Sequence, residues 1–110
     1  LTTAQQLVDA GHEPNRICLD PGIGFGKTLN HNIDLLKGWE TLRGEHDFPI
    51  LWGVSRKSMI GQLTGQSASE DRLFGTLGVA AYAHDVRIDW LRVHDVRAHS
   101  DLLNVLRALD

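Results

Sequence analysis

The spacing of apolar residues changes from segment to segment, and the changes predict alternating helices and strands. Apolar side chains recur every three or four residues over 2–10, 32–43, 67–86 and near the end of the chain, which is the helical period. Shorter apolar runs over 16–19, 49–54 and 90–93 predict buried strands. No hairpin turn separates these strands, so the pattern predicts βα units in a parallel sheet.

Capping residues support the limits of two predicted helices. Thr2 and Gln5 have the spacing of a capping box, and Gly11 would end the first helix. Ser67 and Glu70 have the same capping spacing. We therefore expect the third helix to begin at residue 67.

The size of the chain fits one domain or part of one. It has 110 residues, of which 42% are hydrophobic, enough for a core. Only about three strands are predicted, and such a sheet leaves two edges unpaired unless another part of a larger fold covers them. We therefore expect part of a barrel or of a doubly wound sheet, cut from a longer protein.

Charge and cysteine content exclude some partners and suggest a compartment. A formal net charge of −3 argues against non-specific binding to nucleic acid or to anionic membranes. No apolar run reaches the roughly 18 residues of a membrane span. The single cysteine, Cys18, lies in an apolar run and is expected to be a small buried side chain in a reducing compartment, the cytoplasm.

The stretch LDPGIGFGKT looks like a nucleotide phosphate loop but does not meet its pattern. The phosphate loop needs a glycine where Pro21 stands, and proline has no N–H to donate. The dinucleotide fingerprint also fails, because Gly22, Gly24 and Gly26 are spaced by two. What remains is an acid, Asp20, at the end of a strand, followed by a loop whose backbone a ligand can approach closely.

Polar side chains follow the other predicted strands as well. The segment SRKS follows the second strand, and two polar residues lie two apart on one face of the third. Ligands bind at the C-terminal ends of parallel strands, so we expect four side chains on one rim: Asp20, Lys57, Arg92 and His94. Each has an ordinary structural alternative, such as an Asx turn for Asp20 or a packed imidazole for His94. No His or Cys pair has metal-ligand spacing, and Ser55 lacks the G-x-S-x-G elbow of a hydrolase triad.

Taken together, DPGIGFGK, GVSRKSMIG and LRVHDV resemble the C-terminal part of dihydropteroate synthase. The resemblance covers nearly the whole chain, and no motif position departs from the family pattern. It implies an α/β fold, about three βα units from the C-terminal part of a TIM (β/α)8 barrel, so that residues 1–110 are a partial pterin-binding domain without its N-terminal strands. It also implies a transferase of folate biosynthesis, a sulfonamide target, that condenses 6-hydroxymethyl-7,8-dihydropterin pyrophosphate with p-aminobenzoate to 7,8-dihydropteroate and pyrophosphate.

The resemblance gives each rim residue a role. Asp20 would accept paired N–H donors of the pterin, and Lys57 would reach the ring carbonyl and a ring nitrogen. Arg92 would lie against the pterin face and, with His94, would bind the pyrophosphate. Lys57, Arg92 and His94 are thus the expected catalytic residues.

The p-aminobenzoate pocket would use three further motif residues. Phe25 would form an aromatic wall, Ser58 would open a helix whose N-terminal N–H groups hold the carboxylate, and Arg56 would add positive charge. The family's magnesium ion is expected to take its ligands from the missing N-terminal part and none from this chain. A homodimer of the full-length protein is expected through helices of this half, and these 110 residues alone are expected to be inactive.

Three other functions stay open at this point. Another pterin-binding barrel, such as a methyltetrahydrofolate methyltransferase, shares the aspartate-based pterin site but does not need SRKS and RVHD to hold a pyrophosphate. A non-catalytic paralogue would carry its disabling change outside these motifs. A non-enzymatic interaction domain would use the outer helical face, for which Trp39 and Leu42 are the only signal.

Overall fold

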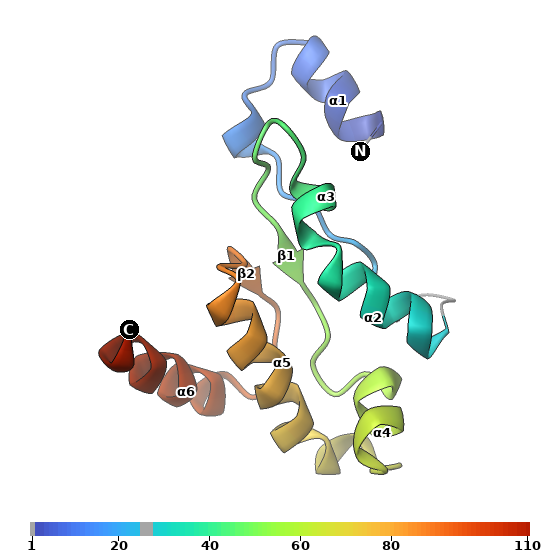
Figure 1. Ribbon diagram of the computed structural model, residues 1–110, viewed down its shortest axis with the longest axis vertical. Helices are drawn as coiled ribbons and strands as arrows, with labels where there is room; N and C mark the ends of the chain where they lie inside the picture. Colours follow the sequence, from blue (N-terminus) through green and yellow to red (C-terminus); the bar gives the residue numbers. More distant parts are fainter. Residues whose placement is uncertain (1, 25–27) are drawn as a thin grey trace.

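The computed structural model describes residues 2–24 and 28–110 (Figure 1). The elements follow in the order α1 (Thr2–Asp9), η1 (Pro14–Arg16), α2 (Leu29–Lys37), α3 (Trp39–Arg43), β1 (Leu51–Trp52), α4 (Ser58–Thr64), η2 (Ser69–Asp71), α5 (Leu73–Asp85), β2 (Trp90–Leu91) and α6 (Val96–Leu109). None of the helices in these two ranges is long and apolar enough to cross a membrane. The molecule is flat, 44 × 36 × 20 Å, with α1 at one end and α4 at the other.

Three extended segments pair in parallel, in the order of the chain. Leu19 bridges to Ile50, and Leu51 donates its N–H to the carbonyl of Leu19 over 2.9 Å. β1 then pairs with β2, so that Leu51 lies beside Trp90 and partners are 39 positions apart in the sequence. The predicted α/β class and parallel strand order are therefore confirmed, although the regular strands are shorter than predicted.

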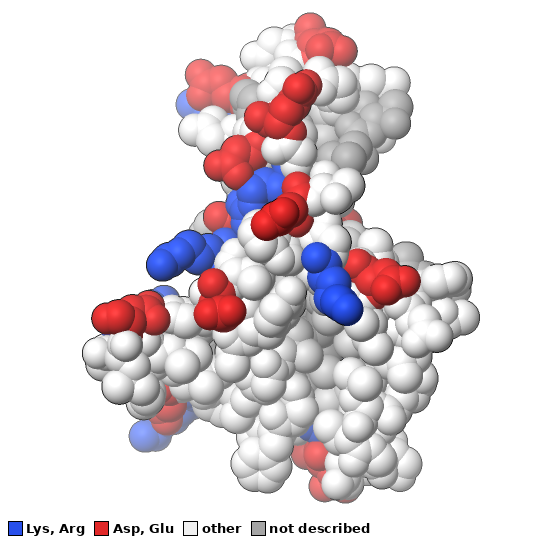
Figure 2. Space-filling view, in the orientation of Figure 1, with Lys and Arg blue, Asp and Glu red and all other residues white. Residues whose placement is uncertain are grey.

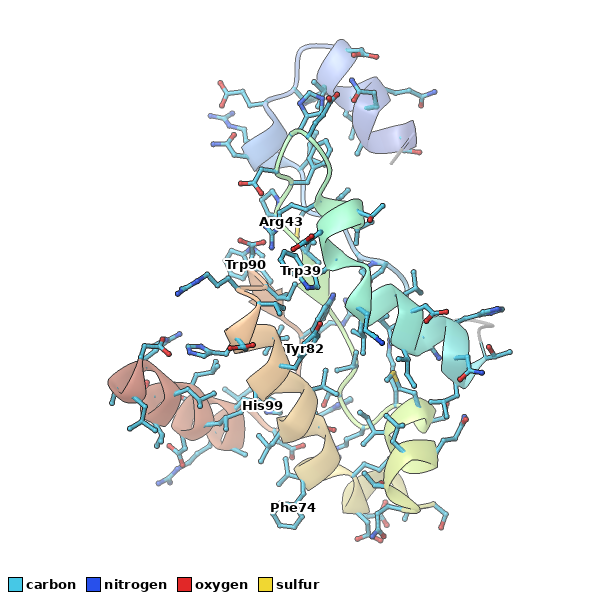
Figure 3. The ribbon with its side chains drawn as sticks, viewed as in Figure 1. Trp39, Arg43, Phe74, Tyr82, Trp90 and His99 are labelled. Carbon is cyan, nitrogen blue, oxygen red and sulfur yellow. The ribbon has the colours of Figure 1, made fainter. Side chains whose placement is uncertain are left out.

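One face of this sheet is buried under helices. Ile50, Trp52 and Val54 alternate with their neighbours to point to that face, and they are 0%, 0% and 4% exposed. They belong to the same apolar cluster as side chains of α2, α4 and α5. Tyr82 reaches from α5 toward β1, and its ring stacks on Trp52 with centroids 6.0 Å apart (Figure 3). This packing fixes β1 against the helices and leaves the other face for chemistry.

The opposite face, which we call the inner face, is open in part. It carries the alternate positions of both strands and their extensions, Leu51, Gly53, Ser55, Trp90, Arg92 and His94. Trp90 is 62% exposed, and the side chain of Arg92 is 57% exposed. The radius of gyration, 14.9 Å, also exceeds the roughly 13 Å of a compact domain of this length. In a closed barrel such a face lines the interior, so its exposure reflects a wall that three strand segments cannot supply.

One arginine ties the segments together at the opposite, N-terminal ends of the strands. Arg43 of α3 donates to the carboxylate of Asp89 over 2.9 Å and to the carbonyl of Arg87 over 3.2 Å. Asp89 also accepts the N–H of Ile50 over 2.8 Å. Trp39 lies beside Arg43 (Figure 3), with the guanidinium carbon 5.9 Å from the centre of its ring. These bonds hold β1 and β2 in one register.

The first two predicted helices are present with modified limits. The first ends at Asp9, and Gly11 follows with a φ of +103°, as expected of a helix stop. The second begins earlier than predicted, at Leu29, because Thr28 caps it by accepting the N–H of His31. It also breaks at Gly38 into α2 and α3.

Three predictions were wrong in the structure. The run 16–19 is not a regular strand, because Arg16 ends η1 and only Leu19 forms a β-bridge. The third helix, α5, begins at Leu73 and not at residue 67, because Arg72 donates to the carbonyls of Gln66 and Ser67 and holds that stretch as a loop with a short 3₁₀ turn. Cys18 is exposed rather than buried, since it lies two positions from Asp20 on the open side of the sheet. The apolar spacing also did not predict α4.

Candidate functional site

Asp20 stands at the end of the first strand segment, as predicted. Its Oδ1 accepts the N–H of Gly22 over 2.9 Å, so the Asx turn that was its structural alternative is present. Its Oδ2 lies 3.5 Å from Nη1 of Arg92. A carboxylate has about four acceptor positions, so these contacts leave it able to accept from a ligand. Gly22 has a φ of +72°, a left-handed conformation that favours glycine and lets the loop turn away from the strand.

Lys57 lies across this glycine loop. Its Nζ donates to the carbonyl of Ile23 over 2.5 Å. A Cβ on Gly24 would stand 3.1 Å from Cδ of Lys57, so only glycine leaves comfortable room for the lysine. Asn32 of α2 holds the loop in place, because its Oδ1 accepts the N–H of Gly24 over 2.9 Å. Asn32 is buried, with 3% of its surface exposed. The sequence analysis did not predict this role of Asn32.

Arg92 lies flat over the neighbouring strand. Its guanidinium occupies the space above Gly53, and a Cβ on Gly53 would overlap two of its atoms. Gly53 and Arg92 are abreast in the parallel pair, two positions beyond Leu51 and Trp90. The absence of a side chain at residue 53 is therefore what lets Arg92 reach Asp20.

His94 is held by the loop that follows β1. Oγ of Ser55 accepts the backbone N–H of His94 over 3.1 Å and lies 2.9 Å from its Nδ1. Ser55 is 6% exposed, so this hydroxyl is shielded from water. The imidazole is thus fixed from its Nδ1 side, and Nε2 is on the other side of the ring.

A second side-chain bridge joins the same two loops. Arg56 donates to both carboxylate oxygens of Asp95, from Nε over 3.0 Å and from Nη2 over 2.5 Å. This hydrogen bond lowers the pKa of Asp95 and raises the pKa of Arg56 from their ordinary values. Arg56 has a φ of +57°, an unusual conformation for a residue other than glycine, and the bridge helps to maintain it. Arg56 is therefore engaged with Asp95.

Three of the four predicted rim residues line one hollow of about 270 Å³. It is lined by Gly53, Ser55, Lys57, Arg92, Val93 and His94. Asp20 adjoins it through its ion pair with Arg92. The structure therefore brings together the four side chains that the motifs predicted, and their charges favour an anion next to an acceptor of N–H groups.

The predicted p-aminobenzoate residues are less fully defined. Ser58 is the first residue of α4 and is exposed at the surface, next to Lys57 in the chain. Phe25 lies outside the described residues. No three His, Cys, Asp or Glu side chains within 2–24 and 28–110 are grouped as metal ligands.

A family model described as "Pterin binding enzyme" matches residues 2–94. The chain belongs to this family. Dihydropteroate synthase of Neisseria meningitidis serogroup C is 47% identical to it over 108 residues, which are 96% of this chain and 38% of that protein. Two solved structures of Thermus thermophilus dihydropteroate synthase also match, each with a TM-score of 0.87.

The Thermus structures extend the comparison to ligands and to the fold. One is a complex with 4-aminobenzoate, 40% identical, and the other a complex with 6HMPPP, 39% identical; the matches cover 98% and 99% of this chain and 43% of each Thermus chain. The chain thus spans about two fifths of the length of these relatives. Its fold is that of the C-terminal part of their (β/α)8 barrel, as the motifs implied.

The pterin-binding family was predictable from the motifs, but several supporting residues were not. Gly53, Asn32 and Asp95 were not singled out, and Ser55 was considered only as a triad member. One signal could have found three of them: aligning GVSR with RVHD at the offset of the parallel strands puts residue 53 beside 92, 55 beside 94 and 56 beside 95. Asn32 has no such signal, because its bond to Gly24 depends on how α2 packs.

Proposed function

We propose that this chain is the substrate-binding part of a dihydropteroate synthase. In the reaction, the C–O bond between the pterin methylene and the pyrophosphate breaks, and the electron pair leaves with the oxygen. The amino nitrogen of p-aminobenzoate forms the new C–N bond and releases a proton. The observation that carries the proposal is that Lys57, Arg92 and His94 line one hollow while Asp20 adjoins it through its ion pair with Arg92.

Asp20 and Lys57 are the proposed pterin ligands. The pterin edge has adjacent N–H donors, and a fixed carboxylate can accept two of them in parallel. The Asx turn at Gly22 supports this role, because it holds the carboxylate in one orientation before the ligand arrives. Lys57 would donate a hydrogen bond to the pterin carbonyl. Its bond to the carbonyl of Ile23 keeps its ammonium group next to the glycine loop that follows Asp20.

Arg92 and His94 are proposed to bind the leaving pyrophosphate. Negative charge grows on the leaving oxygens as the C–O bond breaks, and donors already aimed at that position lower the barrier. Arg92 lies between Asp20 and the hollow, which supports contact with both pterin and pyrophosphate. His94 is a donor to the anion and not a base, because an aromatic amine is already nucleophilic.

The p-aminobenzoate carboxylate is proposed to bind near Ser58, at the start of α4. Phe25 would line this pocket. Two nitrogens of Arg56 are already bonded to Asp95. Arg56 would therefore act on the carboxylate through its positive charge and not through those two nitrogens. The Thermus complex with 4-aminobenzoate supports this ligand class for the family.

The proposal for the complete protein includes three further properties: it binds magnesium, lies in the cytoplasm and forms a homodimer. The magnesium ligands would come from residues outside this chain. For the homodimer, the supporting feature is the helical surface in Figure 2, which carries little charge over α4 and α5. An apolar groove of about 530 Å³ runs between α2, α4 and α5, and Phe74 of α5, 85% exposed, projects from the same helix (Figure 3).

A chimaeric enzyme tests the proposal. Residues 1–110 would replace the matching segment of the meningococcal dihydropteroate synthase, and we call this protein the chimaeric synthase. We expect it to form dihydropteroate and to release pyrophosphate. Asp20→Asn should lower its pterin affinity about ten- to a hundredfold, which is the loss of affinity expected when one charge-assisted hydrogen bond is removed.

Asp101→Asn is the matched control, because Asp101 is an exposed residue of α6 that pairs only loosely with Arg97 at 3.7 Å. A folded chimaeric synthase that binds pterin but forms no product would contradict the proposal. Turnover of methyltetrahydrofolate, with no competition by pyrophosphate for the pterin site, would instead support the methyltransferase alternative.

A further inference from the structure

The parallel register of β1 and β2 continues beyond the last backbone bond of the sheet. That last bond runs from the N–H of Arg92 to the carbonyl of Trp52, over 3.0 Å. Beyond it, side chains form hydrogen bonds between residues at the same offset of 39 positions. These bonds join Ser55 to His94 and Arg56 to Asp95. The two loops that bound the hollow are therefore joined by side chains, one pair after the other.

The Ser55 hydroxyl has one proton and needs an acceptor for it. Its oxygen already accepts the backbone N–H of His94. Among the hydrogen bonds of the described residues, Nδ1 of His94 is the one remaining partner of this oxygen, at 2.9 Å. A hydroxyl that is 6% exposed loses stability if its O–H has no acceptor, so the satisfied arrangement has Ser55 donating to Nδ1.

This hydrogen bond has a consequence for the other ring nitrogen. If Nδ1 is an acceptor, an uncharged imidazole carries its proton on Nε2. His94 lines the hollow together with Lys57 and Arg92. The ring then has an N–H donor on Nε2, available to an anion in the hollow, without having to gain a charge.

We propose that Ser55 is a positioning residue that holds His94 in the Nε2–H tautomer and so presents an N–H donor to an anion in the hollow. The identity of that anion as pyrophosphate rests on the proposed function. Ser55 itself does not contact the anion; it acts through the imidazole. A merely structural Ser55 would need only to accept the backbone N–H of His94, and would leave the tautomer undetermined.

The first test is the tautomer itself, read by ¹⁵N NMR in the chimaeric synthase labelled at histidine. The His94 signals are assigned by their loss in His94→Asn. In the uncharged ring we expect Nδ1 to be pyridine-like and Nε2 to carry hydrogen. Ser55→Thr, which keeps the hydroxyl, should retain this state, and Ser55→Ala should give a mixture of tautomers. A parent protein with hydrogen on Nδ1 would overturn the proposal, whether or not Ser55→Ala folds.

The second test is a double-mutant cycle on pyrophosphate binding, measured by calorimetry with pyrophosphate alone. Ser55→Ala should weaken binding about two- to tenfold, the size of one hydrogen bond, and Ser55→Thr should restore it. In the His94→Asn background, Ser55→Ala should have no further effect, because its partner is gone. Equal losses in both backgrounds would overturn the proposal. Ser100→Ala, an exposed serine of α6, is the matched control and should bind as the parent does.

The two proposals fail in different ways. A chimaeric synthase that has the Nε2–H tautomer and binds pyrophosphate, but forms no dihydropteroate, would contradict the proposed function and leave the role of Ser55 intact. An active synthase whose tautomer and pyrophosphate affinity do not respond to Ser55→Ala would contradict the role of Ser55 and leave the proposed function intact.

Discussion

Gly53 shows how one missing side chain can create a binding position. The residue is buried in the sheet, and the guanidinium of Arg92 lies where its Cβ would stand. Arg92 can therefore lie flat, between Asp20 on one side and the hollow on the other. The arrangement depends on space rather than on backbone conformation, since Gly53 has no positive φ.

We predict that Gly53→Ala displaces Arg92 and leaves the fold intact. Because Arg92 is 57% exposed, its side chain can move out toward water instead of distorting the strand. Pyrophosphate affinity of the chimaeric synthase should fall about tenfold or more, as expected when a charge-assisted hydrogen bond is lost. Calorimetry with pyrophosphate measures the affinity, and circular dichroism checks the fold.

Gly78→Ala is the control for this substitution. A Cβ on Gly78 meets no atom within 4 Å, and the residue lies inside α5. Alanine there should leave pyrophosphate binding unchanged and stabilise the protein by about 0.5–1 kcal/mol, through higher helix propensity. Unchanged pyrophosphate affinity in Gly53→Ala would mean that the guanidinium does not need its present place.

At the scale of elements, β1 and β2 are joined at both ends by side chains. Arg43 and Asp89 link their N-terminal ends, and Arg56 and Asp95 link the loops at their C-terminal ends. The second pair lies next in the chain to residues that line the hollow, Ser55 and His94. The two regular strands are short, so these bridges do much to keep the register on which the hollow depends.

The Arg56–Asp95 bridge predicts a pH-dependent contribution to stability. The pKa of Asp95 is lowered in the folded protein, chiefly by its hydrogen bond from Arg56. Its stabilising effect is therefore fully present above the unfolded pKa of about 3.9 and is lost as the pH falls through the lower, folded pKa. Asp95→Asn should be less stable than the parent at pH 7, and the two should converge in strong acid.

Urea unfolding of the chimaeric synthase and its Asp95→Asn variant, between pH 7 and pH 2, measures this difference. Asp101→Asn again serves as control, since the Asp101 carboxylate is exposed and lies 3.7 Å from its partner Arg97. A constant difference in midpoint between parent and Asp95→Asn across this range would show that the carboxylate charge does not stabilise the bridge.

The elements also show what could be predicted from sequence. The alternation of helical and strand-like apolar spacing was enough to predict parallel strands separated by helices. The polar residues at the strand ends were enough to predict which side chains lie near one another on the rim. The start of α5 was not predictable, because Arg72 bonds to Gln66 and Ser67 and overrides the local capping signal. The exposure of Cys18 was not predictable either, since it depends on which face of the sheet is covered. In neither case did the apolar spacing or the capping pattern contain the contact that decided the outcome.

At the scale of the whole molecule, the sheet is not closed. Within residues 2–24 and 28–110 the sheet has three parallel segments, and Trp90 and Arg92 of its inner face are exposed to water, whereas Gly53 and Ser55 are buried. The chain corresponds to about two fifths of the length of its relatives. The hollow lined by Lys57, Arg92 and His94, with Asp20 adjoining it, is therefore present, but the described residues do not supply the wall opposite it.

We predict that the 110-residue chain alone forms no dihydropteroate, whereas the chimaeric synthase does. Without the opposite wall, water reaches the hollow and weakens every electrostatic contact with the leaving group. Chromatographic detection of dihydropteroate after incubation with both substrates makes the comparison. Product above background from the chain alone would show that the four rim residues suffice.

The open inner face has a practical consequence through Trp90. This indole is 62% exposed, whereas Trp52 on the opposite face of the sheet is fully shielded at 0%. Covering the inner face would take Trp90 out of water, so its fluorescence should shift to shorter wavelength and become protected from iodide quenching. Trp52 and Trp39, which packs against the buried cluster that contains Trp52, would contribute a constant background. The chain thus contains its own optical probe for the docking of the remaining barrel strands, one that reports assembly without substrate or label.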